Sequence, residues 1–192
     1  TAPTQSNQSR GRKTDGSNIW AIYADPTPGQ TNNPATDYVS YAPKPVITTT
    51  PGFYYPSSGM IQVVIQNPLP GFIVRYTTDG GQPTGGSIEY TGPITVDKTT
   101  VIRARTFSVD PSILPSFSET NTYFIDETHT MPVVSLASRD FEDLFSGFGG
   151  EISNYIEYFE DGVLRFEQQG DIRGHGNDSW AYAQKGMRFY AR

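Results

Sequence analysis

The chain has 192 residues, of which 35% are hydrophobic and 13% aromatic, and its formal net charge is −6 at neutral pH. This composition can supply a core, but 19 Gly and 15 Pro interrupt it too often for long helices, and the acidic balance without basic clusters excludes a nucleic-acid partner. The absence of cysteine excludes a disulfide framework, a thiolate metal site and a cysteine nucleophile, and no apolar run is long enough for a transmembrane segment.

Residues 1–33 are polar and rich in Thr, Asn, Ser and Pro. Their one compact apolar cluster lies at residues 19–23, and it predicts a single strand that ends at the turn sequence PTPG of residues 26–29. Residues 34–45 contain spaced prolines, which disfavour a helix, so this stretch is predicted to form an extended linker.

Residues 46–126 have a different character. Short β-rich runs are separated by Pro, Gly and Asp turns at the spacing typical of an all-β sandwich. Asp79 and Gly80 predict a tight turn, because glycine tolerates a positive φ and the aspartate side chain can bond the turn backbone. The predicted strands are 61–65, 72–76, 94–96, 100–107 and 121–125.

Residues 127–192 predict a further strand-rich region. Acidic residues near the start of 139–145, together with apolar ones, favour one or two helical turns. Asp161 and Gly162 predict a hairpin turn between two strands. Because a strand needs a neighbour, the region is expected to continue beyond residue 192. Its predicted strands are 131–136, 155–160, 163–168 and 187–191.

Two stretches resemble known modules of extracellular proteins. Residues 11–16 (GRKTDG), Trp20 and residues 26–32 (PTPGQTN) resemble the C-terminal end of a bacterial lamin-tail domain. That family has an immunoglobulin-like sandwich fold, and the resemblance implies that its final strands occupy residues 1–33.

The second resemblance is to the chitobiase/β-hexosaminidase C-terminal type of domain. It rests on residues 52–54 (GFY), 74–84 (VRYTTDGGQPT), 90–94 (YTGPI) and 100–105 (TVIRAR), which follow one another in order. The resemblance implies a fibronectin-III-like sandwich over residues 46–126. Gly81 stands where a serine is usual, a change expected to loosen the turn without altering the fold.

A third resemblance covers the C-terminal part. Residues 122–125 (TYFI), 131–136 (MPVVSL), 170–176 (GDIRGHG) and 184–192 (QKGMRFYAR) look like the N-terminal part of a spore-coat CotH-type domain, a family of atypical, kinase-like proteins. This implies a truncated α+β domain over residues 127–192. The order of the three modules is similar to that in large surface proteins of Bacteroidetes-like bacteria. The expected fold class is therefore mainly β, with a sandwich flanked by two partial domains.

The kinase-like resemblance makes Arg173, His175, Asp178 and Lys185 the candidates for chemistry. Glycine-flanked N–H groups and Lys185 would approach nucleotide phosphates, with Mg-ATP as the cofactor of a full-length domain. The Mg²⁺-binding carboxylates of the family would lie past residue 192, so no kinase activity is expected of this chain. The favoured alternative is a strand–turn–strand whose basic side chains are solvated or ion-paired.

Other charged side chains favour structural roles. His129 and His175 lie far apart, without metal-ligand spacing or a serine-nucleophile motif, and His129 is expected in an inter-domain turn. No metal site is predicted. One acidic set could suggest the paired carboxylates of a glycosidase, but a solvated strand face is the favoured interpretation. This set is Glu157, Glu160, Asp161 and Glu167.

Aromatic residues offer a binding alternative, because flat rings stack on the apolar faces of sugars. In a sandwich most such rings fill the core or cover edges, so this is the minority interpretation. The candidates are Tyr54, Tyr55, Tyr76, Tyr90 and Trp180.

The sequence therefore predicts a non-catalytic connector and interaction segment of a large exported protein, located at the cell surface or outside the cell. Its expected partners are the neighbouring domains of the same longer chain and secretion or cell-surface machinery. A fragment of a CotH-like kinase and a carbohydrate-binding module are the alternatives. Both ends of the sequence are expected to cut through domains, with any export signal outside it.

Overall fold

The computed structural model describes residues 3–66, 68–145, 150–176, 182–183 and 185–191. These residues form strands joined by turns, with one short helix, which confirms the predicted mainly-β fold class. Within the described ranges, no helix has the length and apolar character needed to cross a bilayer.

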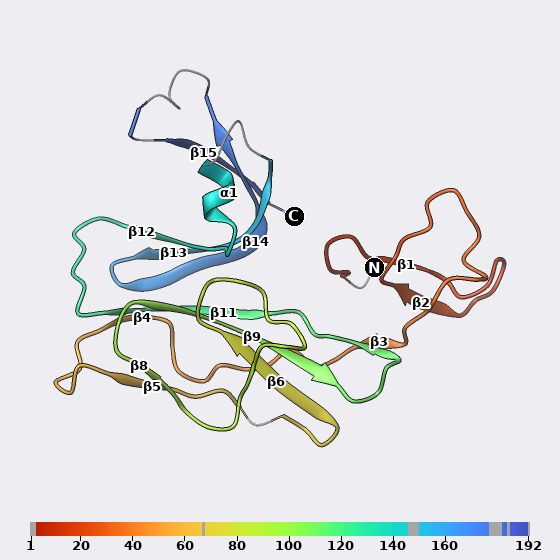
Figure 1. The fold of residues 1–192 in the computed structure, drawn as a ribbon, viewed down its shortest axis with the longest axis horizontal. Coiled ribbons are helices and arrows are strands. Elements are labelled where there is room, and N and C mark those ends of the chain that lie inside the picture. The colour runs from red at the N-terminus through yellow and green to blue at the C-terminus, as the bar shows by residue number, and fades with distance from the viewer. Residues whose placement is uncertain (1–2, 67, 146–149, 177–181, 184, 192) are drawn as a thin grey trace.

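The central part of the chain is a β-sandwich of two unequal sheets (Figure 1). The smaller sheet pairs β5 (Ile61–Val63) with β8 (Ile94–Val96), and a bridge between Ile47 and Ile65 extends it. The larger sheet has five strands in the order β4 (Gly52–Tyr54), β11 (Glu119–Ile125), β9 (Thr100–Ser108), β6 (Phe72–Thr77) and β7 (Ile88–Glu89).

The core of the sandwich lies between these two sheets. It is built from alternate residues of each strand, as a sheet with one face in the core requires. On β9 these are Ile102 and Ala104, both fully buried, and on β11 they are Tyr123 and Ile125. The intervening residues of β11 are buried as well. Something other than solvent therefore covers the outer face of the five-stranded sheet.

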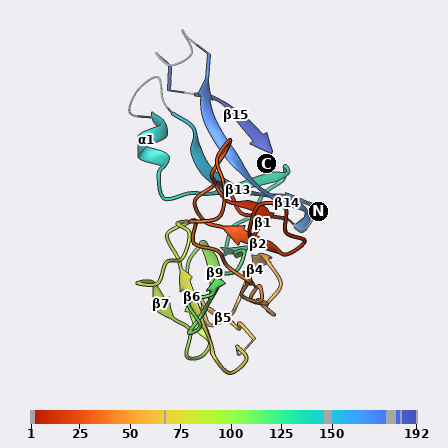
Figure 2. The same ribbon diagram turned by 90° about the vertical axis from the view of Figure 1, so that its right-hand side faces the viewer.

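That cover is a separate, four-stranded antiparallel sheet formed by the C-terminal part of the chain (Figures 1 and 2). A short helix, α1 (Phe141–Phe145), packs on its far side, where Leu144, Ile152 and Ile172 form a small core. The helical turns predicted at 139–145 are confirmed by this element. The strands, in order, are β12 (Val133–Ala137), β13 (Ile152–Glu160), β14 (Val163–His175) and β15 (Gly186–Ala191).

Both predicted tight turns are present. Asp161 and Gly162 have φ values of 52° and 73° and alone join β13 to β14, as the two-residue hairpin requires. Gly80 has a φ of 76°, and the Asp79 carboxylate accepts a hydrogen bond from the Gly81 N–H at 3.0 Å. Local turn chemistry was sufficient to locate both.

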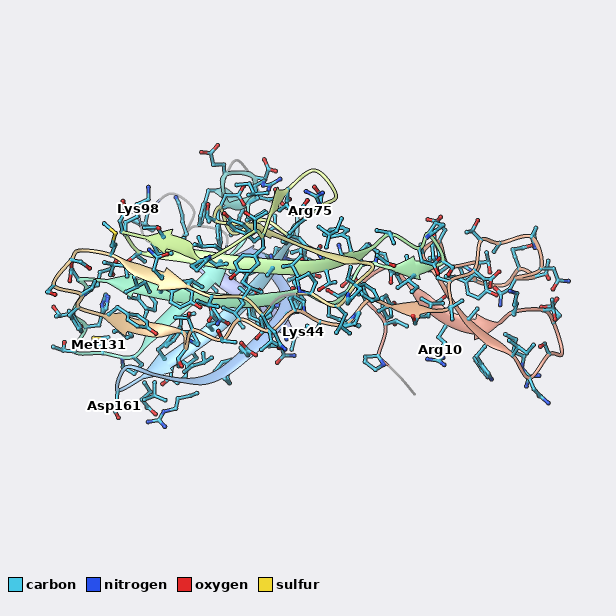
Figure 3. The ribbon with its side chains drawn as sticks, turned by 90° about the horizontal axis from the view of Figure 1, so that it is seen from below. Arg10, Lys44, Arg75, Lys98, Met131 and Asp161 are labelled. Carbon is cyan, nitrogen blue, oxygen red and sulfur yellow. The ribbon has the colours of Figure 1, made fainter. Side chains whose placement is uncertain are left out.

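The N-terminal part forms a hairpin beside the sandwich. The expected strand at 19–23 is β2 (Trp20–Tyr23), and it pairs with β1 (Ser9–Arg12), which was not anticipated. Further along, β3 (Ser40–Tyr41) lies within residues 34–45 and pairs in parallel with β10 (Ile113–Leu114) of the sandwich. Figure 3 shows the resulting elongated shape, with Arg10 at one end and Met131 and Asp161 at the other.

Candidate functional site at the joint between two sheets

Buried polar side chains gather between the five-stranded sheet and the C-terminal sheet. We call this buried layer the joint. On β11 the joint side carries Thr120, Thr122 and Phe124, which alternate with the core-facing residues. The other joint side chains come from the turns and strands on both sides and are Phe53, Arg103, Ser135, Tyr155, Glu157, Phe159 and Gln169.

One end of the joint is aromatic. The rings of Phe53 and Phe124, from the sandwich, are stacked with their centroids 4.4 Å apart. Phe159 of β13 meets both of them edge to face, at 6.0 and 5.3 Å, and is 1% exposed. His129, in the connection between the two units, lies 5.7 Å from Phe53. Such offset and T-shaped pairs add to the area buried and fix the rings relative to one another.

The centre of the joint is polar. Glu157 of β13 is 1% exposed, and its Oε1 accepts a hydrogen bond from the backbone N–H of Thr122 at 3.1 Å. Its Oε2 bonds the Thr122 hydroxyl, which in turn lies 2.6 Å from the Ser135 hydroxyl. The carboxyl of one sheet thus bonds both the backbone and a side chain of the other.

The environment of Glu157 makes it hard to ionise. Burial raises the pKa of Glu157 to about 7, although the hydrogen bonds from Thr122 act in the opposite direction. The nearby carboxylates of Glu167 and Glu119 raise this pKa further. Near neutral pH the carboxyl therefore exists in both protonation states. The prediction that Glu157 belongs to a solvated strand face is wrong, whereas Glu160, Asp161 and Glu167 are exposed as expected.

Arg103 lies at the other end of the joint, away from the aromatic rings, and is 4% exposed. Its guanidinium donates to the carbonyl of Gly80 at 3.1 Å and to Oε1 of Gln169 at 3.3 Å, and lies 5.9 Å from the ring centroid of Tyr155. Burial lowers the pKa of Arg103 to about 10, so it keeps its charge at neutral pH. Among the described residues no carboxylate forms an ion pair with it, so neutral dipoles and a ring face hold the charge.

A glycine turn of the sandwich closes the joint at this end. A Cβ on Gly80 would lie 3.0 Å from the backbone N and O of Ser138, and one on Gly81 would lie 2.6 Å from Nε of Arg139. The Arg139 guanidinium pairs with Asp79 at 3.0 Å. The glycine at position 81, where the resemblance led us to expect serine, therefore leaves room for Arg139 from the segment between β12 and α1.

Replacing Gly80 with alanine tests this close approach. We expect a loss of about 2 kcal/mol in the free energy of unfolding, from a positive φ and from crowding of the Ser138 backbone. Gly59 is a matched control, since it has a φ of 70° and nothing within 4 Å of an added Cβ. The Gly59→Ala variant should lose only about 1 kcal/mol, the contribution of the φ angle. Equal losses in urea denaturation would contradict a specific contact at Gly80.

The structure brings the nucleotide-binding candidates to one hairpin. Arg173 of β14 lies opposite Arg188 of β15, His175 lies opposite Gly186, and Lys185 directly precedes that strand. Arg173 and His175 are exposed and Lys185 is partly buried. Asp178, the fourth member of the predicted cluster, lies outside the described residues.

The four carbohydrate-binding candidates that the structure describes do not form one platform. Tyr90 is 8% exposed, and its hydroxyl accepts the Ile65 N–H at 3.0 Å, so it is a core residue and its ring cannot stack on a ligand. Tyr54 and Tyr76 pack against the same core, and Tyr55 is exposed with its hydroxyl bonded to the Glu127 carbonyl at 2.6 Å. Trp180 lies outside the described residues.

Metal-binding groups are not gathered in the described part of the chain. No three His, Asp or Glu side chains there could hold a metal ion together. His129 instead lies 3.1 Å from the Glu127 carboxylate, in the connection between sandwich and C-terminal sheet. It was expected in such an inter-domain turn.

Comparison with known proteins gives one match. Residues 49–112 match the model of the family described as "Chitobiase/beta-hexosaminidase C-terminal domain". The sandwich contains a module of this type. No curated protein and no solved structure matches the chain. The β11 strand, which follows the matched stretch, pairs with β4 and β9 of this chitobiase-type module and carries Thr120, Thr122 and Phe124 of the joint.

Proposed function

We propose that the chain is a non-catalytic connector in which the chitobiase-type module holds the C-terminal sheet in a fixed orientation. The observation that carries the proposal is the buried carboxyl of Glu157, which bonds the backbone of Thr122 across the joint at 3.1 Å. If a flexible tether joined the two units, solvent would reach both the Glu157 carboxyl and the Thr122 N–H. Both groups are instead buried and paired with each other, because burying either without a partner would be costly.

The spread of the contacts supports the same role. Along β13, Phe159, Glu157 and Tyr155 each face a different partner group, so that the aromatic, polar and cationic contacts follow one another. The glycine turn and the Asp79–Arg139 pair lie beyond them. A joint held at several places along its length has no single point about which it can hinge.

Distance measurement between the two units tests the proposal. The chain contains no cysteine, so spin labels can be attached at Ile88→Cys on β7 and Met187→Cys on β15 without removing native thiols. Both native side chains are exposed, so labelling leaves the joint intact. Pulsed electron–electron double resonance should give a single narrow distribution of the distance between the two spin labels.

The interpretation depends on a comparison of variants. Adding Phe159→Ala, which removes the aromatic end of the joint, should broaden the distribution. Adding Phe166→Ala, an exposed phenylalanine on the neighbouring strand, should leave it narrow. A broad distance distribution in the labelled chain without further substitutions would contradict the connector role.

We further propose the wider setting of this connector. The resemblance of residues 1–33 to a lamin-tail end and of residues 127–192 to a CotH-type domain supports a place in a large, multidomain exported protein at the cell surface, of the kind found in Bacteroidetes-like bacteria. Neighbouring domains of the same chain and cell-surface or secretion machinery would be its partners. Mg-ATP would be the cofactor of a complete CotH-like domain, to which Arg173, His175 and Lys185 would contribute.

A further inference from the structure

A cleft opens where three parts of the chain meet. It has a volume of about 630 Å³, within the range of small-ligand sites. Gln5 of the N-terminal segment, Gln82 of the sandwich and Gln169 of the C-terminal sheet all line it. The cleft therefore exists only while these three parts hold their relative positions.

The walls of the cleft carry almost no uncompensated charge. Among the described residues, Lys44 is the one charged side chain of the lining, and its Nζ pairs with the carboxylate of Glu119. Burial raises the pKa of Tyr155, so its phenol stays neutral. A phosphate or carboxylate ligand would need unpaired cations, which these walls lack. The remaining polar lining consists of amides and hydroxyls, which suit a neutral ligand.

Two of the amides are fixed and form part of the wall. The Gln5 side chain donates to the Pro115 carbonyl at 2.8 Å and bonds Arg105, which attaches the N-terminal segment to the sandwich. The Gln169 side chain donates to the Asn154 carbonyl at 2.8 Å and accepts from Arg103. Their positions are set before any ligand arrives, which lowers the entropic cost of binding.

Other polar groups are available. The side chains of Asn7 and Gln82 line the cleft, are exposed, and form no side-chain hydrogen bond within the described ranges. The Ser118 hydroxyl at the wall has no hydrogen-bond partner among the described residues, but it is buried and therefore not accessible to a ligand in this arrangement. Amides and hydroxyls both donate and accept, so they match the hydroxyl groups of a sugar.

Two aromatic rings complete the lining, and one of them is accessible. Phe117 is partly buried and is held edge to face against Tyr41, with centroids 5.1 Å apart. Tyr155 is 8% exposed and is held beneath the Arg103 guanidinium, so it supports the wall as a buried residue. A ring that is held in place, such as that of Phe117, provides apolar surface for the C–H face of a sugar at low entropic cost. We propose that this cleft binds a short, neutral, polyhydroxylated ligand of the oligosaccharide class.

Titration with defined sugars tests the proposal. The probes are cellotriose, maltotriose and triacetylchitotriose, each added to ¹⁵N-labelled protein and followed by amide chemical shifts. At least one should perturb the amides of Gln5, Gln82 and Gln169 together. Gln82→Ala should weaken that binding about fivefold, the effect of one lost hydrogen bond. Gln66→Ala, which changes an exposed glutamine that bonds the Val46 backbone and does not line the cleft, should bind as the unmodified chain does.

Several results would overturn the inference. These are perturbation by none of the three probes at millimolar concentration, perturbation centred on Tyr55 instead of the cleft, and equal weakening by Gln82→Ala and Gln66→Ala. The connector role is tested by label distances measured without sugar. Its failure is therefore distinguishable from failure of the cleft.

Discussion

Replacing Phe159 with alanine should lower the free energy of unfolding by about 4 kcal/mol, the usual loss for a fully buried phenylalanine. The ring is 1% exposed and contacts the rings of Phe53 and Phe124 from the sandwich. Its removal leaves a cavity between two units, not within one. We therefore expect the C-terminal sheet to unfold at lower urea concentration than the chitobiase-type module in this variant.

Phe166→Ala is the matched control for this experiment. Phe166 lies on β14 opposite Tyr158, stacks on that ring at 5.4 Å, and is 49% exposed. Its loss should cost less than about 1 kcal/mol, as most surface substitutions do. If both variants lost the same stability in urea denaturation, the aromatic end of the joint would have no special role.

Raising the pH from 4.5 to 7 should lower the free energy of unfolding by about 3 kcal/mol through Glu157 alone. The folded protein keeps its proton up to a pKa of about 7, whereas the unfolded chain releases it near 4.5. The folded state therefore binds more protons in this interval. The contribution is fully present below pH 4.5, declines as the pH rises, and levels off above pH 7.

Glu157→Gln isolates this effect. Glutamine keeps an oxygen that can accept the Thr122 N–H and carries no charge, so this variant should be the more stable protein at pH 8. The difference should shrink toward pH 5, where Glu157 is protonated. Glu160→Gln is the control, because Glu160 is an exposed carboxyl on the same strand. Parallel pH profiles of unmodified protein and Glu157→Gln in urea denaturation would contradict a buried, proton-holding Glu157.

The two experiments probe different parts of one joint. Phe159 supplies buried apolar area, and Glu157 supplies a hydrogen bond whose strength depends on its protonation. Because the two side chains are two residues apart on β13, combining the changes should reveal coupling. A departure from additivity in the double variant would indicate that the ring and the carboxyl hold the same interface.

Strands and turns could be predicted where local chemistry determines them. Alternation and β-branched residues located β6, β8 and β9 closely, and the Asp161–Gly162 dipeptide located its hairpin because both residues tolerate a positive φ. The β1 strand was missed, since Ser9–Arg12 has no apolar alternation. The strand forms because it pairs with β2, although its own residues show no strand pattern.

The residues of the joint could not be recognised in this way. Thr122 and Glu157 are polar, and a polar residue within a strand usually faces solvent. Their burial follows from the stacking of one sheet on another, which joins positions 35 residues apart. The same holds for Tyr90, an aromatic candidate for sugar binding that is a core residue, bonded to the Ile65 backbone.

For this protein, amino-acid pattern determined the β-rich class, the positions of several strands and two tight turns, because these depend on neighbours in the chain and on turn geometry, while resemblance to a known family located the chitobiase-type module. The packing of the C-terminal sheet on that module, the space at Gly81 and the three-part cleft arise from contacts between distant segments. Hydrophobic alternation specifies which face of a strand is buried, but not that a second sheet covers the opposite face. Packing of the C-terminal sheet buries this opposite face of the five-stranded sheet as well, and the joint forms between the two sheets.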